Sequence, residues 1–272
     1  MRQQATDEVA RTRSDAATGF TGWANRFGRG ALAIAVLAAL ALALAGPGHR
    51  LGLYDFMVGF TLLKWSIYGA AAALLLALTG TALALWRGPR RALLVSLTAL
   101  VIALGTAAVP LGMLVQARSV PPINDITTDP DDPPVFEAIL PLRAGAPNSA
   151  DYPGRPVADQ QRVAYPEIQP IEVALPPDAA FEVALATIET LDWTIVARDL
   201  ARGRIEATDT TFWFGFVDDI VIRVRPEGAG SRIDLRSVSR VGVSDLGKNA
   251  ERIRTFIDEF NRRLAEVDPS AG

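Results

Sequence analysis

The stretch that decides the fold runs from Phe212 to Asn249 and reads FWFGFVDDIVIRVRPEGAGSRIDLRSVSRVGVSDLGKN. Apolar residues recur at every second position in Ile220–Val224 and again in Ile233–Leu235, which is the period of a half-buried strand. Between these runs, Pro226–Gly230 contains two glycines and has the length of a hairpin connection. The stretch therefore predicts two antiparallel strands joined by a tight turn.

The register of this hairpin follows from its turn. If Arg225 pairs with Arg232, the alternation of side chains assigns every other pair to one of two faces. The face predicted to lie under the helices pairs Val224 with Ile233, Ile222 with Leu235, Ile220 with Ser237, and Asp218 with Ser239. The opposite face pairs Arg223 with Asp234 and Val221 with Arg236, with Asp219 and Arg240 close by. Polar residues thus enter the covered face at one end.

Elements on either side of the hairpin complete the predicted domain. Ile171–Leu175 alternates as a short strand, and Asp178 is expected to cap the helix that follows it. A second hairpin is predicted around residues 200–203, and a last helix follows Ser244–Asp245. The apolar stripes of the two helices are Phe181, Leu185, Ile188 and Leu191, then Ile253, Phe256, Ile257, Phe260 and Leu264. Residues 171–267 are therefore predicted to form an α+β domain, an antiparallel sheet covered on one face by two helices.

The apolar residues of the chain are concentrated before residue 116. Residues 31–48, 62–86 and 92–115 are predicted to form three transmembrane helices, since a spanning helix needs about 20 apolar residues. No charged residue lies within 66–86 or 92–115, which disfavours an ion pathway and favours a membrane anchor. Residues 1–30, with five arginines, are predicted to be a cytoplasmic tail.

The placement of arginine predicts how these helices are oriented. The tail and the loop Arg87–Arg91 hold most of the arginines that flank the apolar segments, and such flanks stay in the cytoplasm. The amino terminus is thus expected inside, and everything after Arg118 is expected in the periplasm of a bacterium, with the helices in the inner membrane. A rival interpretation takes residues 31–45 as a signal peptide cleaved after Ala45, which leaves two crossings and the same location for the domain.

Residues 117–170 are rich in proline and are predicted to form an extended connection. Within it, four carboxylates fall in eight residues, namely Asp125, Asp129, Asp131 and Asp132. They are candidate ligands for calcium, but the stretch lacks the glycine and the glutamate of an EF-hand loop. Solvated turns, in which aspartate side chains accept hydrogen bonds from the backbone, are the favoured interpretation.

Composition limits the chemistry that is available. The chain has no cysteine, so disulfides, thiolate metal sites and cysteine nucleophiles are excluded. The single histidine, His49, lies between apolar segments, which excludes a Ser-His-Asp triad and a multi-histidine metal site in the domain. A net charge of −3 gives no indication of a nucleic-acid partner, and no cofactor is expected.

The polar end of the central hairpin holds the candidate site residues. Asp218 with Ser237 or Ser239 is a candidate for hydrolase catalysis, but a network that fixes the hairpin against the last helix is the favoured interpretation. Arg236 and Arg240 are candidates for holding an anion near the start of that helix.

The aromatic run Phe212–Phe216 is the other candidate. Strand alternation places its three phenylalanines on the core side and Trp213 outward. Trp213 is therefore a candidate for contact with a partner or a lipid surface.

Several strings in the chain resemble a known family. They are Phe216-Val217-Asp218-Asp219, Arg236-Ser237-Val238-Ser239-Arg240-Val241-Gly242, Ser244-Asp245-Leu246-Gly247 with Asn249, and, upstream, Pro121–Asp129 and Pro133–Phe136. Together, over roughly Pro121 to Phe260, they resemble membrane-anchored members of the bacterial and plastid family called domain of unknown function 1499. The family has no agreed activity, so the resemblance implies location and architecture and assigns no catalytic residue.

These observations predict a bacterial inner-membrane protein whose periplasmic domain binds or scaffolds something in the cell envelope. The expected partners are the lipid bilayer and an envelope protein or lipid. Two alternatives stay open. One is an envelope hydrolase that uses Asp218 with Ser237 or Ser239, and the other is a lipid or hydrophobic-ligand binder with a pocket between sheet and helices.

Overall fold

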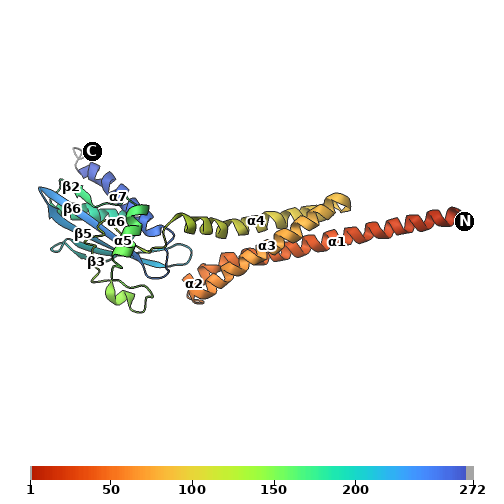
Figure 1. Ribbon diagram of the computed structural model, residues 1–272, viewed down its shortest axis with the longest axis horizontal. Helices are drawn as coiled ribbons and strands as arrows, with labels where there is room; N and C mark the ends of the chain where they lie inside the picture. Colours follow the sequence, from red (N-terminus) through yellow and green to blue (C-terminus); the bar gives the residue numbers. More distant parts are fainter. Residues whose placement is uncertain (1, 268–272) are drawn as a thin grey trace. The chain divides into compact units, whose positions relative to one another are not determined.

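The computed structural model describes residues 2–267, and it describes side chains from residue 21 onward with the exception of Arg87. The chain divides into two compact units, which meet between Leu114 and Val115. Figure 1 traces both units along the sequence.

The first unit consists of helices. They are α1 (Arg2–Ala45), the short α2 (Pro47–Arg50), α3 (Phe56–Arg87) and most of α4 (Arg90–Ser119). Three segments are long and apolar enough to cross a membrane, namely Thr21–Arg50, Phe56–Trp86 and Arg90–Ser119. The prediction of three apolar helices before the domain is therefore confirmed.

The helix bounds differ from the predicted ones at the amino-terminal side. The backbone of α1 is already helical through the segment predicted as a tail, although the side chains of residues 2–20 lie outside the described part. The helix α3 begins at Phe56, six residues before its predicted start, because Asp55 caps it by accepting a hydrogen bond from the Met57 amide (2.9 Å).

Small side chains form the interior of this helical unit. Each layer takes one alanine from each of α1, α3 and α4, and the layers are Ala31, Ala77 and Ala99, then Ala35, Ala73 and Ala103, then Ala24, Ala84 and Ala92. Between two of these layers, a Cβ atom on Gly80 would lie only 2.6 Å from the Ser96 hydroxyl. Large side chains such as Leu75 and Val101 are exposed instead. Small residues at such positions let helix backbones approach closely in a membrane.

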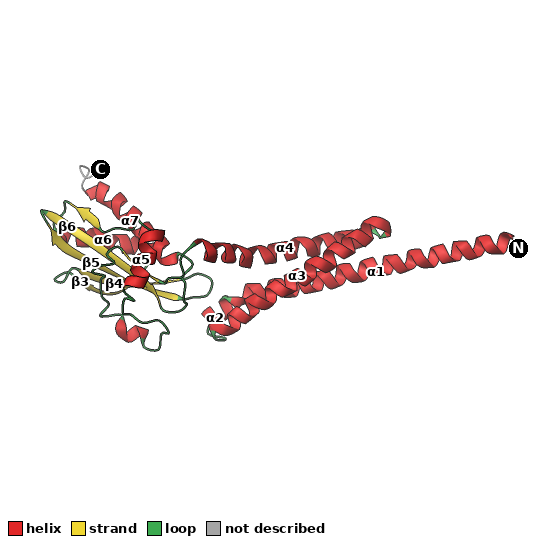
Figure 2. Ribbon diagram, in the orientation of Figure 1, coloured by secondary structure: helices red, strands yellow, loops and turns green. Residues whose placement is uncertain are grey.

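The second unit is the α+β domain, and Figure 2 shows its strands and helices. Its elements are β1 (Asp125–Thr127), η1 (Leu140–Arg143), α5 (Arg155–Ala164), β2 (Ile171–Val173), α6 (Pro177–Thr190), β3 (Thr194–Asp199), β4 (Arg204–Thr210), β5 (Val217–Glu227), β6 (Gly230–Ser239) and α7 (Lys248–Val267). All pairings are antiparallel, in the order β1-β6-β5-β4-β3, and β2 also pairs with β6.

The central hairpin has the register expected from its turn. Arg225 lies opposite Arg232, Ile222 opposite Leu235, and Asp218 opposite Ser239. A contiguous apolar core fills the space between one face of the sheet and the helices α6 and α7, with Ile220, Leu235, Phe181, Phe256 and Phe260 among its buried members. The predicted two-layer α+β fold is confirmed.

Two predicted details of this domain are wrong. Asp178 does not cap α6. The helix begins at Pro177, so Asp178 already lies inside it and the capping position is Pro176. A proline at the first helical position loses no hydrogen bond, and Asp178 lies in the first turn, where its charge suits the helix dipole.

The aromatic run is a turn rather than a strand, with Thr211 N donating to Phe216 O (2.8 Å) and Gly215 at φ 72°. Strand alternation therefore does not apply to it. Phe212 is 88% exposed while Phe214 is buried.

The proline-rich segment differs most from its prediction as an extended connection. It supplies the edge strand β1 and the ten-residue helix α5. Helix α5 tolerates its proline because Pro156 lies in the first turn, where the missing amide has no partner to lose. The segment is thus part of the domain.

Candidate functional site

The outer face of the sheet, opposite the helices α6 and α7, is covered by the chain between β1 and α5. A small apolar cluster joins them, made of Phe136 and Ile139 from the covering segment and Val221 and Val238 from the sheet. The buried Glu206 carboxylate on β4 accepts backbone hydrogen bonds from Glu137, Ala138 and Ile139 (2.8 to 3.1 Å). The covering segment is therefore held by both packing and polar contacts.

Arg236 is at the centre of this face. Its Nε and Nη2 donate to the two carboxylate oxygens of Asp125 (2.9 and 2.7 Å), and both side chains are 1% exposed. Its guanidinium also donates to the carbonyls of Pro134 and Ala150, and it lies over the Phe136 and Tyr152 rings. Because its donors are used inside the domain, this geometry gives no support to the anion site predicted at Arg236.

Arg240 is similarly engaged. Its Nε and Nη2 donate to the buried Asp219 carboxylate, and its Nη1 donates to the Leu142 carbonyl (3.0 Å). Arg143 from η1 pairs with the same carboxylate. The carboxylate of Asp219 thus joins the sheet to the segment that covers it, and the anion-binding role predicted for Arg240 gains no support from this geometry.

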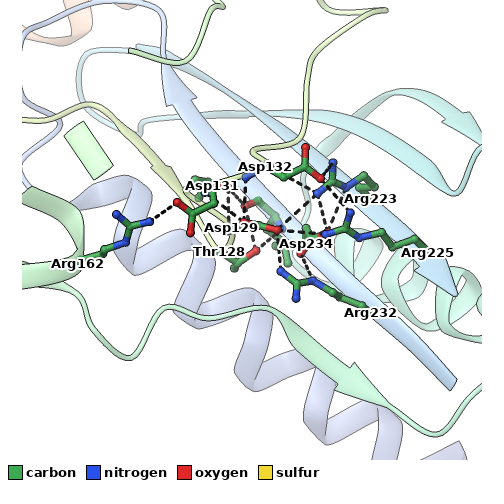
Figure 3. A network of polar contacts seen from close by, with 11 residues as sticks. Thr128, Asp129, Asp131, Asp132, Arg162, Arg223, Arg225, Arg232 and Asp234 are labelled. Carbon is green, nitrogen blue, oxygen red and sulfur yellow. Dashed lines mark hydrogen bonds and ion pairs between the residues drawn. The ribbon is translucent and has the colours of Figure 1, made fainter. Parts of the chain in front are cut away.

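A network of arginines and aspartates continues toward the β5–β6 turn. Figure 3 shows three guanidiniums, from Arg223, Arg225 and Arg232, converging on Asp234 of β6. The same arginines reach two aspartates of the covering segment, with Arg232 to Asp129 at 2.7 Å and Arg225 to Asp132 at 2.9 Å.

The predicted cation ligands are all paired with arginine. Asp125 pairs with Arg236, Asp129 and Asp132 belong to the network just described, and Asp131 pairs with Arg162 (2.6 Å). Asp129 also accepts hydrogen bonds from the amides of Asp131 and Asp132, the turn geometry that the favoured interpretation required. In the part of the chain that the structure describes, no group of His, Cys, Asp and Glu side chains is arranged to hold a metal ion.

Asp129 and Tyr152 differ in how this environment changes their pKa. Burial disfavours the ionised form of Asp129, but the Asp132 amide, Arg232 and the Asp131 amide together lower its pKa below the usual value. Burial raises the pKa of Tyr152 to about 12, and the charge of Asp125 acts in the same direction.

The split edge of the sheet carries a pocket lined mainly by polar residues. Strands β1 and β2 pair with opposite ends of the same edge of β6, and a cavity of about 410 Å³ opens between them and α5. We call it the split-edge pocket. Its lining includes Thr128, Asp129, Asp131, Gln161, Arg162, Tyr165, Gln169, Glu172 and Arg232.

One wall of this pocket depends on Gln161 of α5. Its carboxamide accepts a hydrogen bond from the Thr127 amide (3.0 Å) and donates one to the Thr127 carbonyl (2.6 Å), and the residue is 1% exposed. The side chain thereby pairs with β1 as a neighbouring strand would. This contact orients α5 so that the next residue, Arg162, lines the pocket.

The polar end of the central hairpin is held by helix α7. Arg252 donates to Asp218 (2.7 Å) and to Asp209 (2.7 Å), and all but 5% of its side chain is buried. Asn249 accepts a hydrogen bond from the Ser237 hydroxyl (2.7 Å) and donates one to Ser239 (3.0 Å).

These contacts favour the structural interpretation of Asp218. The Asp218 carboxylate pairs with the Arg252 guanidinium, while the hydroxyls of Ser237 and Ser239 both bond to Asn249 rather than to Asp218. Sequence patterns did not predict that Asn249 and Arg252 of α7 bond to this end of the hairpin. Their helical spacing of three residues places them on one face of α7, but it does not indicate which polar groups they contact.

A family model described as "Protein of unknown function (DUF1499)" matches residues 125–260. The chain belongs to this family. The DUF1499 match begins with β1 and ends within α7, so it includes the aspartates and the covering segment as well as the sheet.

Among solved structures, the DUF1499 chain is similar to the crystal structure of TTHA0849 from Thermus thermophilus. The identity is 13%, the match covers 36% of this chain and 96% of that chain, and the TM-score is 0.25. No curated protein matches the chain.

Proposed function

We propose that this protein is a membrane-anchored binding module of the bacterial inner membrane, with its α+β domain in the periplasm and a small polar ligand in the split-edge pocket. The observation that carries the proposal is the lining of that pocket, where Arg162 and Arg232 share a concave wall with Asp131 and Glu172. Pockets that combine a hollow shape with a few convergent polar groups are the usual ligand sites of proteins.

The arrangement of the helices supports the anchoring part of the proposal. Three helices are long and apolar enough to span a membrane, and small side chains fill their interior. The five arginines among residues 1–30 and those in the loop Arg87–Arg91 support a cytoplasmic amino terminus, because cytoplasmic flanks carry the excess of positive charge.

The two arginines of the pocket differ in how firmly they are held. Arg232 is fixed by hydrogen bonds to Asp129 and Asp234 (2.7 and 2.9 Å). Arg162 pairs with Asp131 at the surface, where the side chains are 43% and 86% exposed. Because exposed ion pairs contribute little, Arg162 can exchange this partner for an anionic group of a ligand at low cost.

The same reasoning indicates the ligand class. An anionic group would meet Arg162 and Arg232, while hydroxyl or ammonium groups would meet the carboxylates of Asp131 and Glu172. We therefore infer a small molecule that carries a carboxylate or phosphate together with hydrogen-bond donors, such as an amino acid or a sugar acid.

Thermal unfolding of the full chain in lipid nanodiscs tests this function. The chain is heated with amino acids, sugar acids, inorganic phosphate or neutral sugars, one class at a time. A ligand of the inferred class should raise the unfolding temperature of the wild type and of Arg202→Gln, but not of Arg162→Gln. Arg202 is a matched control because it is an exposed arginine that pairs with Glu137 outside the pocket.

Two results would contradict the proposal. One is that none of the anionic classes shifts the unfolding temperature. The other is a shift of equal size in Arg162→Gln, since binding would then take place elsewhere on the domain.

A further inference from the structure

Three loops meet at one end of the sheet, where β5 begins and β6 ends. They are residues 140–148, 211–216 and 241–247. Arg240 N donates to the Val217 carbonyl (3.1 Å) and Asn148 N donates to the Arg240 carbonyl (3.1 Å), so the loops are held side by side. The β5–β6 turn lies at the opposite end of this strand pair.

Large apolar side chains are exposed on all three loops. The exposed fractions are 88% for Phe212, 81% for Val243, 53% for Leu142 and 48% for Leu140. We call these four residues the apolar rim. Contiguous exposed apolar surface with a polar border marks protein or membrane interaction sites.

The chain enters the domain from α4 at this same end. Residues Val115–Ser119, the last of α4, belong to the same unit as the sheet. Gln116 Nε2 donates to the Leu246 carbonyl (3.1 Å), and Asp245 N donates to the Ile123 carbonyl (3.3 Å). A membrane crossing by α4, which is long and apolar enough for one, would end beside the loop 241–247 that Gln116 contacts.

Charged groups beside the rim suit the headgroup region. Arg118 is in the last turn of α4, and the exposed ammonium group of Lys248, next to loop 241–247, pairs with the exposed Glu251 carboxylate (2.7 Å). The nearby Asp245 carboxylate is used internally, as acceptor for the amides of Gly247 and Asn249 (2.8 and 2.7 Å). Basic residues next to exposed aromatic and aliphatic side chains are typical of surfaces that lie in a membrane interface.

We propose that the apolar rim inserts into the lipid interface beside α4, in the leaflet where α4 ends. The occupant of this surface is therefore the bilayer itself. Since α4 already tethers the domain, the local concentration of lipid at the rim is high, and shallow insertion of Phe212 and Val243 is enough to hold the domain against the membrane. The domain would then have two attachments, a helix and a loop surface, and a defined orientation.

Single-cysteine labelling tests the proposal, because the chain has no native cysteine. Phe212→Cys, Val243→Cys and the control Ala229→Cys each receive an environment-sensitive fluorophore. Ala229 is exposed in the β5–β6 turn, at the other end of the sheet. The labelled full chains are reconstituted in vesicles of phosphatidylcholine and phosphatidylglycerol that contain nitroxide-labelled lipid.

Insertion predicts that the labels at 212 and 243 emit at shorter wavelength and are quenched several-fold more strongly by the nitroxide lipid than the label at 229. Aqueous iodide should quench in the reverse order. Equal iodide quenching at all three positions would overturn the proposal. Protection from iodide without quenching by nitroxide lipid would also overturn it, since a protein contact would then cover the rim.

The replaced side chains are exposed. A circular dichroism spectrum matching that of the wild type confirms folding before the measurement. Leu142→Cys repeats the test on the third loop, and an iodide-accessible label there would remove residues 140–148 from the inserted surface.

Discussion

At the scale of single residues, the domain depends on buried arginine and carboxylate pairs. Arg236 is the largest fully buried side chain among the described residues of the domain. Its positive charge is balanced by the Asp125 carboxylate, to which its guanidinium donates two hydrogen bonds. Such pairs cost desolvation energy that only good geometry returns, so their loss is felt mainly when one partner is removed.

Removing one member of this pair should be more damaging than removing both. We expect Asp125→Leu or Arg236→Met alone to lower the free energy of unfolding by about 3 to 5 kcal/mol, because the remaining group stays buried without its partner. Asp125→Leu with Arg236→Met should lose less than the sum of the two single changes. Pulse proteolysis of the full chain in nanodiscs across a urea series measures each value, and additive losses would contradict the coupling.

The Asp129 carboxylate makes the free energy of unfolding of the domain depend on pH in the acid range. Its folded pKa lies below the value for an unfolded aspartate, so its contribution is present above that unfolded value, about 3.9, and is lost as the pH falls through the folded value. Asp129→Asn should therefore be less stable at neutral pH and should lose less stability on acidification than the wild type. The urea midpoint at several pH values between neutral and acid measures this. Asp159→Asn, an exposed change, should keep the wild-type pH slope.

At the scale of secondary structure, periodicity predicted the sheet better than its covering segment. The register of β5 and β6 followed from alternation and one turn, and the apolar stripe of α7 followed from helical spacing. The proline-rich segment was harder, since β1 has only three residues and α5 is positioned by one buried carboxamide, that of Gln161. Contacts so far apart in sequence leave no local period to detect.

Gly203 should be the least replaceable position of the β3–β4 turn. It has φ 60°, and a Cβ atom there would overlap the Val224 carbonyl oxygen, while the glycine carbonyl accepts a hydrogen bond from the Val224 amide (2.7 Å). Gly203→Ala should cost more than about 2 kcal/mol, from strain and steric overlap together.

Gly145→Ala is the matched control for this change. Gly145 also has positive φ, at 86°, but an added Cβ atom would meet open space. Its replacement should cost only the backbone strain, about 1 kcal/mol. Equal losses in the two variants, measured by the same urea series, would show that the overlap at Gly203 is relieved by movement of the strand.

At the scale of the whole molecule, the candidate site was predicted only in part. The four aspartates Asp125, Asp129, Asp131 and Asp132 were recognised as a group, and solvated turns were the favoured interpretation. Asp129 accepts the expected backbone hydrogen bonds but is buried, and Asp125 is buried in β1 beside Arg236. The arginines that pair with them lie about a hundred positions away along the chain or on another element, so composition could not indicate the pairing. The split-edge pocket was missed for the same reason, because it exists only once β1, β2 and α5 are assembled.

The proposed orientation predicts which loops reagents reach from outside the cell. Ala229→Cys, in the exposed β5–β6 turn, should react with a membrane-impermeant maleimide in intact cells with a permeabilised outer membrane. Pro89→Cys, in the loop between α3 and α4, should react only after lysis. The reverse pattern would place the domain in the cytoplasm and remove the basis for a periplasmic ligand.

The contact between Gln161 and Thr127 has a further consequence for a protein crowded in a membrane. A strand at the margin of a sheet offers its unpaired backbone groups to any neighbouring chain, which is a common route to aggregation. In β1 the carboxamide of Gln161 satisfies both groups of Thr127. Because the Gln161 side chain occupies the amide and the carbonyl of Thr127, an adjacent copy cannot add a strand to β1 through hydrogen bonds at that residue.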